Sequence, residues 1–333
     1  MVTFHPPTTR RSVAALGAGL IAAAFARRGA RAEPAGTPAQ IIGAFDRLFG
    51  GPQAGQRAIH AKGVLCDGSF TPAPDAGLLS RAPHLQGPAV PILARFSNFA
   101  AVPGLPDGDP ASNPRGFAVR FLLPDDGDTD IVAHSYNGFP ASTPAEFLAF
   151  LRAVADPVAL AAYTEAHPAA RAFIEHPKPT PASYGTEAYF GVNAFRFSNA
   201  AGMSRHGRYR IVPLAGVSHL DIKDAAGLAP DFLSHELAER LQRGPVAFHL
   251  LIQLAEEGDP VTDGTVLWSA DRALVELGTL TLRALVPAGD ERQSGLAFVP
   301  TNLVGGIAPS ADPMLAARTT AYRLSSERRF ETP

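Results

Sequence analysis

An arginine and a tyrosine lie four residues apart near the C-terminus, in "DPMLAARTTAYRLSSERRF", residues 312–330. The segment predicts a short helix, so Arg318 and Tyr322 fall on one helical face. A guanidinium placed there can donate hydrogen bonds to the phenolic oxygen and favour the phenolate, although an unperturbed tyrosine has a pKa of about 10. A tyrosine packed on an amphipathic helix is the alternative interpretation of the same spacing.

Further polar residues that could do chemistry lie far upstream. His60 lies in "RAIHAKG" and Ser97 in "LARFSNF". Arg57 and Arg95 belong to the same two segments, and Arg115 lies in "NPRGFAVRF". Arg95 interrupts an apolar strand, and burying a guanidinium is costly unless an anion meets it. Two interpretations of Arg95 are compatible with this pattern. It either binds an anion in a buried site or forms a salt bridge on an exposed strand face.

The elements that must position these residues are short, because 31 glycines and 31 prolines punctuate the chain. Hydrophobic periodicity and capping signals predict helices at 38–50, 143–157, 158–175 and 234–244, besides the C-terminal one. Alternating or apolar runs predict strands within 58–70, 90–99, 113–135, 186–199, 206–216, 245–257 and 277–287. We therefore predict an α+β fold, with an antiparallel barrel-like sheet surrounded by helices.

The N-terminus has the features of an export signal. Arg10 and Arg11 precede a mildly apolar run over 13–26, and small residues follow at 30–32. The run is shorter than the roughly 20 residues of a spanning helix. We expect residues 1–32 to be a twin-arginine-type signal peptide, residues 33–333 to form one domain, and the mature protein to work in the periplasm without a membrane anchor.

Composition excludes several classes of protein. The formal net charge of −2 offers no basic surface for nucleic acid, and 46% apolar residues suffice for a large core. The single cysteine, Cys66, cannot form an internal disulfide or hold an iron–sulfur cluster. We expect it to be a small buried apolar residue.

Five segments occur in a characteristic order, "RAIHAKG", "LARFSNF", "NPRGFAVRF", "YFGVNAFRFSNAAG" and "RTTAYRLSSERR". Together they resemble the haem catalase superfamily, in particular its small catalase-related peroxidases. The resemblance implies a catalase-like antiparallel β-barrel with surrounding helices and a buried haem b. The chain ends soon after the tyrosine helix, as that subgroup does, whereas longer catalases continue into further helices and a nucleotide-binding domain.

On the proximal side of the haem, the resemblance makes Tyr322 the iron ligand and Arg318 its hydrogen-bond partner. Asp312 occupies the place of the acidic residue in the same relay. The histidine that usually links the two is matched by Asn193, a departure that we expect to weaken the relay and to change the redox poise of the iron.

On the distal side, the resemblance makes His60 the base that moves the peroxide proton and Ser97 the partner that fixes its tautomer. The family also has an asparagine that helps to orient peroxide. An alignment without a gap puts Ser135 in that place, and a shift of two puts Asn137 there. We favour Asn137.

Further residues are expected to hold the macrocycle. Arg57, Arg95 and Arg329 match the family's propionate-binding arginines. We expect Arg115 to contribute to cofactor binding as well. Phenylalanines either line the apolar pocket or belong to the core; they are Phe117, Phe139, Phe147 and Phe150.

The resemblance implies a haem-dependent peroxidase that reduces hydrogen peroxide or organic hydroperoxides with a small reducing co-substrate and has at most weak catalase activity. The alternatives are a haem enzyme that rearranges hydroperoxides, a non-catalytic haem-binding or carrier protein, and an apolar-ligand barrel without haem. The twin-arginine export machinery is an expected partner, and a homodimer is a family-level expectation.

Overall fold

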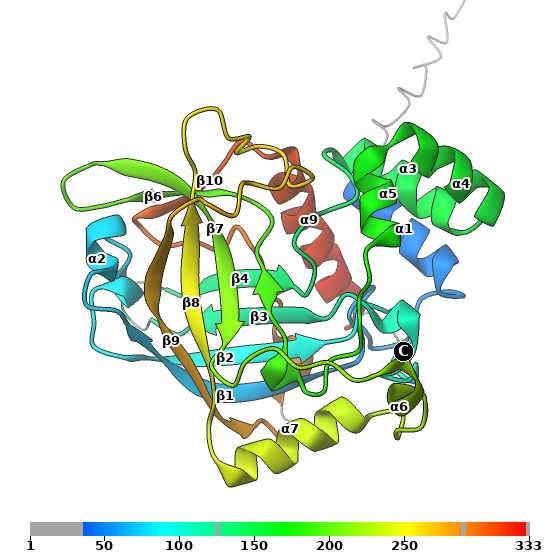
Figure 1. Cartoon of the computed structure of the whole chain (residues 1–333), viewed down its shortest axis with the longest axis horizontal. Helices are drawn as coiled ribbons and strands as arrows, with labels where there is room; N and C mark the ends of the chain where they lie inside the picture. The colour runs from blue at the N-terminus through cyan, green and yellow to red at the C-terminus, as the bar shows by residue number, and fades with distance from the viewer. Residues whose placement is uncertain (1–35, 124, 126, 288–290, 331–333) are drawn as a thin grey trace, which may run out of the picture. The chain divides into compact units, whose positions relative to one another are not determined.

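Eight antiparallel strands close into a barrel in the computed structural model, which describes residues 36–330 except 124, 126 and 288–290. The described residues belong to one compact unit. Around the barrel the order is β7–β5–β4–β3–β2–β1–β9–β8, and pairing of β8 with β7 closes it. The predicted antiparallel barrel is confirmed (Figure 1). The strands span Gly63–Pro72 (β1), Val90–Ser97 (β2), Gly116–Phe121 (β3), Thr129–His134 (β4), Tyr189–Phe190 (β5), Ser204–Pro213 (β7), Val246–Leu254 (β8) and Leu274–Leu285 (β9).

Two further strands extend one side of the sheet. Strand β6 (Phe195–Ser198) pairs with β7, and β10 (Ile307–Pro309) pairs with β6. Because β7 pairs with β5, β6 and β8 along different parts of its length, it belongs to both the barrel and this extension.

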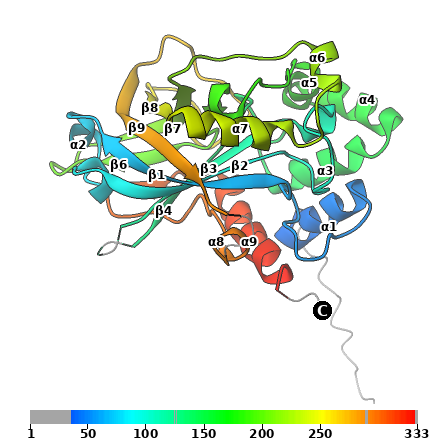
Figure 2. The same cartoon turned by 90° about the horizontal axis from the view of Figure 1, so that it is seen from below.

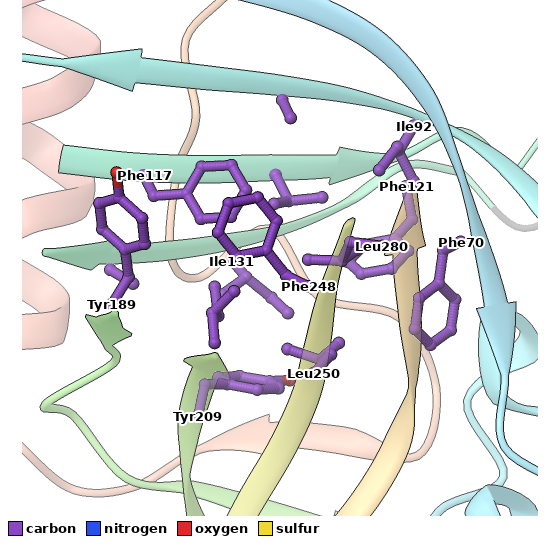
Figure 3. Packing of buried hydrophobic residues seen from close by; sticks show 14 of the residues in the cluster. Phe70, Ile92, Phe117, Phe121, Ile131, Tyr189, Tyr209, Phe248, Leu250 and Leu280 are labelled. Carbon is purple, nitrogen blue, oxygen red and sulfur yellow. The ribbon is translucent and has the colours of Figure 1, made fainter. Parts of the chain in front are cut away.

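Aromatic and aliphatic side chains fill the barrel interior (Figure 3). Phe96 and Phe117 stack with ring centroids 4.4 Å apart, and Phe248 lies 5.1 Å from Phe117. Cys66 is fully buried in this core, as expected, and burial raises the pKa of its thiol to about 12. The interior is therefore packed core, and a ligand must bind outside it.

Helices form a second layer beside the barrel. They are α1 (Pro38–Leu48), α3 (Pro144–Val154), α4 (Pro157–Ala166), α5 (Pro168–Glu175) and α9 (Pro313–Arg328). Figures 1 and 2 show α9 beside α1, and buried side chains of α1, α3 and α9 share a second hydrophobic cluster. Helix α4 has no buried residue and α5 has only Ala170, so both cover this cluster loosely.

Helix starts follow the capping chemistry of the sequence. Thr37 and Gln40 form a complete capping box at α1. At α3, the Thr143 hydroxyl accepts from the amide of Glu146, while the Glu146 carboxylate accepts from the amide and hydroxyl of Ser142. The longest of the remaining helices is α7 (Phe232–Arg243), and the others are α2 (Ala76–Leu79), α6 (Ile222–Ala226) and α8 (Glu291–Gly295).

The prediction of strand structure from Ala58 onward is wrong over its first five residues. Strand β1 begins at Gly63, and the segment before it is irregular. Within that segment His60 has φ 57°, a left-handed conformation that a residue with a side chain rarely adopts. Within the described residues, no helix combines the length and the apolar character needed to cross a bilayer.

A buried histidine in the short helix Pro83–Leu85 gives a stability prediction. The ring of His84 lies against Phe121 with centroids 4.5 Å apart, and its Nδ1 has no hydrogen-bond partner in the described part of the chain. Burial lowers the pKa of His84 to about 4. The unfolded chain therefore binds a proton on this residue at higher pH than the folded chain does, and stability falls as pH falls through this window.

We expect a His84→Phe variant to lose this acid sensitivity. Between pH 7 and pH 4.5 the wild-type free energy of unfolding should fall by about 2 kcal/mol more than that of the variant. Urea titrations at the two pH values measure the difference. His235→Phe, at an exposed site on α7, serves as the control. Equal pH slopes for wild type and His84→Phe would contradict the prediction.

Candidate active site

A cavity of about 670 Å³ separates the barrel from the helical layer. One wall is the outer face of β2, β3 and β4, and helices α1, α3, α5 and α9 contribute to the other walls. Most of the residues predicted from the sequence line this cavity, namely Arg57, His60, Arg95, Ser97, Phe117, Phe139, Phe147, Phe150, Asn193, Arg318, Tyr322 and Arg329. Residues as far apart in the sequence as Arg57 and Arg329 thus meet at one place.

The pleat of the sheet explains which strand residues reach the cavity. Successive side chains point to opposite faces, and cross-strand partners share a face. Arg95 pairs with Ala118, and Ala118 pairs with Val132 in the next strand. All three line the cavity, whereas Phe96 between Arg95 and Ser97 packs inside the barrel.

Tyr322 and Arg318 lie one turn apart on α9, as their spacing predicts. Arg318 donates from Nη2 to the Tyr322 oxygen at 2.8 Å and from Nε at 3.3 Å. Two donors of one guanidinium therefore converge on the same phenolic oxygen and fix its position. An oxygen held in this way could be the protein ligand of a haem iron.

A continuous chain of hydrogen bonds supports this arginine. Arg318 Nη1 donates to Asn193 Oδ1 at 2.5 Å, and Asn193 Nδ2 donates to Asp312 Oδ2 at 2.7 Å. The other oxygen of Asp312 caps α9 by accepting from the amide of Met314. Asn193 therefore joins its two neighbours without a gap, and its amide remains neutral where a histidine could carry charge.

His60 approaches from the sheet wall. Its Nδ1 lies 3.1 Å from Ser97 Oγ, which is the contact predicted to fix the tautomer. The backbone of His60 is held by two further contacts: its amide donates to Phe99 O at 3.0 Å, and its carbonyl accepts from Arg95 Nη2 at 3.0 Å. These contacts hold the residue in a left-handed conformation that costs about 1 kcal/mol.

The surroundings keep the imidazole of His60 neutral. Burial lowers the pKa of His60 to about 3, and the positive charge of Arg95 acts in the same direction. When Nδ1 carries the proton and donates to the serine hydroxyl, Nε2 of the neutral imidazole is available as a base. At any pH above about 4, the imidazole of His60 is therefore unprotonated and can accept a proton.

Three arginines gather at one end of the cavity without a carboxylate partner among the described residues. Arg57 donates to Leu296 O at 2.7 Å, and Arg329 donates to Ser326 Oγ at 2.9 Å. The Nε atoms of Arg95 and Arg329 have no hydrogen-bond partner in the described chain. Burial and the charges of Arg95 and Arg329 lower the pKa of Arg57 to about 8.

These features fit the haem that the resemblance implies. Buried arginines with unused donors call for anions, and two propionate groups would supply them. The largely apolar cavity has a volume within the usual range of cofactor pockets, and Arg318 holds a phenolic oxygen in its wall. Tyr322, Arg57, Arg95 and Arg329 are therefore the residues that would hold the group.

Arg115 does not belong to this site, contrary to the prediction. It is fully buried and donates to Asn98 Oδ1 at 2.6 Å, to Ser112 O and to Asp107 O. Asn98 also donates to the Asp107 carboxylate at 2.6 Å. Arg115 precedes β3 and thus lies outside the register that brings Arg95 to the cavity. Arg115 therefore connects the loop segments that contain Asn98, Asp107 and Ser112.

The predicted distal asparagine is also wrong. Asn137 and Ser135 are absent from the residues that line the cavity. Strand β4 ends at His134, so the pleat turns Ser135 to the other side, where its hydroxyl accepts from the amide of Arg115. A tight turn from Tyr136 to Gly138 then carries Asn137 away.

Phe117 is a core residue in spite of its place at the cavity margin. Its ring stacks on Phe96 inside the barrel, because its position in β3 faces inward (Figure 3).

Phe147 lines the cavity as predicted, and its ring centroid lies 4.9 Å from that of Phe139. The cavity residues that were not predicted include His134, and Phe99, whose ring lies edge-on to His60 at 5.7 Å. Strict alternation along "DIVAH" would have pointed to His134.

Comparison with known proteins gives one family. The family model described as Catalase matches residues 48–332. The catalase-related peroxidase of Mycolicibacterium paratuberculosis is 42% identical over 299 residues, which cover 87% of this chain and 93% of that protein. The catalase-related peroxidase of Synechococcus elongatus is 34% identical over 304 residues, with 88% of each chain covered.

Solved catalases share the fold. Catalase A from Saccharomyces cerevisiae superposes with a TM-score of 0.76 at 24% identity, covering 83% of this chain. A bacterial catalase superposes with a TM-score of 0.75 at 24% identity, covering 84% of this chain. The chain spans 61% and 58% of the lengths of these two structures.

Proposed function

Since the chain belongs to the catalase family, we propose that it is an exported haem b peroxidase that reduces hydrogen peroxide or organic hydroperoxides with a small external electron donor. It is a haem-dependent oxidoreductase that acts on peroxide. The main support for this proposal is that two pairs of residues line the same cavity from different walls. One pair is Tyr322 with Arg318, and the other is His60 with Ser97.

Haem, when bound, supplies an iron that binds peroxide and accepts the oxidising equivalents of its O–O bond. The remaining work falls to side chains of this chain. His60 Nε2 accepts the proton of the inner peroxide oxygen and returns it to the outer oxygen, so that water leaves. Ser97 holds the tautomer that leaves Nε2 free, and the aromatic wall, including Phe99, keeps bulk water away from the base.

The preference for peroxidase activity over dismutation is part of the proposal. Its support is the match to two catalase-related peroxidases over nearly their whole lengths. Apolar residues of the cavity wall, including Val102, Leu105 and Ile174, also suit a peroxide with an organic substituent.

We expect the purified haem-loaded protein to oxidise a dye donor in the presence of an organic hydroperoxide, and to evolve oxygen from hydrogen peroxide more slowly than it oxidises the dye. Parallel absorbance and oxygen-electrode assays measure the two rates. Fast oxygen evolution without dye oxidation would refute the preference for peroxidase activity. Consumption of hydroperoxide with the donor left out would point to rearrangement.

Export to the periplasm by the twin-arginine machinery completes the proposal. Its support is Arg10 and Arg11 before a short apolar run, and these residues lie outside the described part of the chain. Assembly into a homodimer is proposed from the family alone.

A further inference from the structure

A row of paired residues runs across the end of the sheet wall. Ser97 in β2 pairs with Gly116 in β3, and Gly116 pairs with His134 in β4. Directly paired residues of neighbouring strands point to the same face of a sheet. The side chain of Ser97 reaches His60 on the cavity side, so His134 belongs to that side too, and it lines the cavity.

Gly116 leaves the space in which the two histidines meet. A Cβ atom at Gly116 would lie 3.0 Å from Cε1 and Nδ1 of His60 and 2.6 Å from Ser97 Oγ. The His60 ring therefore lies directly over this glycine. His134 stands on the adjoining strand, where paired Cα atoms are about 5 Å apart. Two imidazoles thus share one corner of the cavity.

The hydrogen bonds of His134 indicate its tautomer. The amide of Tyr136 donates to His134 Nδ1 at 3.4 Å, a long bond whose direction is unambiguous because an amide can only donate. Nδ1 is therefore the acceptor, and the proton of the neutral ring is on Nε2. This Nε2 has no hydrogen-bond partner among the described residues, although it is shielded from solvent.

The charge state of His134 agrees with this arrangement. Burial lowers the pKa of His134 to about 3, and the positive charges of Arg318 and Lys178 act in the same direction. The ring is neutral at physiological pH, so it offers one N–H donor and no net charge. A buried donor without a partner is costly, and an acceptor that enters the cavity would relieve that cost.

We propose that His134 Nε2–H donates a hydrogen bond to a peroxide oxygen in the cavity and so orients the substrate for His60. The inference rests on the proposed function. The two imidazoles have complementary states: Nε2 of His60 is an acceptor and moves the proton, whereas Nε2 of His134 is a donor and keeps its own. His134 thereby takes the task that the resemblance gave to an asparagine.

Fluoride binding to the haem-loaded protein tests this role without turnover. Fluoride accepts hydrogen bonds and has no proton to give, so its affinity reports a donor in the cavity and not a base. We expect His134→Phe to weaken fluoride binding by about tenfold or more, as loss of a hydrogen bond to an anion does. His134→Gln, which restores an N–H donor, should recover most of the affinity.

The remaining variants separate this role from general damage. His134→Met removes the donor with a flexible side chain and replaces His134→Phe if that ring disrupts the pocket. His84→Phe, at a buried histidine outside the cavity, should leave fluoride binding unchanged. Fluoride affinity equal to wild type in both donor-free variants would overturn the inference, even if peroxide turnover fell. A protein without any haem absorption would instead overturn the proposed function.

Discussion

Replacement of His60 by alanine is expected to slow the reaction with peroxide by about 100- to 10,000-fold, the usual loss when a positioned proton acceptor is removed. The haem spectrum and haem content should stay close to those of wild type, because His60 is not among the residues that would hold the macrocycle. Stopped-flow mixing with hydrogen peroxide measures the rate. An unchanged rate would indicate a non-catalytic haem carrier.

The backbone at position 60 makes a second variant necessary. His60 has φ 57°, a conformation that asparagine and histidine adopt more readily than alanine does. His60→Asn therefore removes the base while keeping the local conformation, and it should be as slow as the alanine variant. His249→Ala, at an exposed histidine of β8 that contacts Glu276, should react like wild type.

The neutral state of His60 also predicts the pH dependence of this rate. A base reacts in its unprotonated form, and burial and Arg95 lower the pKa of His60 to about 3. The wild-type rate should therefore be flat from pH 8 to pH 5 and fall only under more acidic conditions. A midpoint near pH 6.5 would instead mean that the base is solvated.

Removal of the Tyr322 hydroxyl should have the other large effect. Tyr322→Phe keeps the ring on α9 but removes the oxygen to which Arg318 donates at 2.8 Å. We expect the iron to lose its protein ligand, the absorption spectrum to change, and haem to transfer to a competing apoprotein much faster. Absorption spectra and transfer kinetics measure both effects.

The hydrogen-bond chain behind Tyr322 predicts a side effect. Without the phenolic oxygen, two donors of Arg318 remain unsatisfied next to the cavity, so the variant should also be less stable by about 1–3 kcal/mol. Tyr163→Phe, which removes a hydroxyl that donates to Glu146 O outside the cavity, is the matched control. An iron spectrum identical to wild type in Tyr322→Phe would refute the ligand assignment.

Much of the fold was predictable from local patterns. Thr37 and Thr143 mark helix starts by side-chain capping, and the strand runs appear where alternation or apolar character indicates them. The Arg318–Tyr322 pair could be placed because residues four apart on a helix always meet. Arg95 could be suspected because a guanidinium within an apolar strand requires a partner.

The sequence was insufficient where register and strand ends decide the outcome. Arg95 lies within β2 and Arg115 directly before β3, yet one faces the cavity and the other a buried polar network. Likewise, a shift of β4 by one residue in its pairing with β3 would have exchanged the places of His134 and Ser135. Such differences depend on pairing between distant strands, which short-range patterns do not specify.

The sheet wall of the cavity and the outer helices α4 and α5 should differ in how much change they tolerate. The sheet wall backs onto a densely filled barrel, so almost any replacement that alters its volume disturbs the catalytic geometry. Helices α4 and α5 bury almost nothing, and Val158 on α4 is 80% exposed. Laboratory evolution toward other hydroperoxides should therefore accumulate its successful substitutions in this loosely attached cover, while the reaction centre stays as it is.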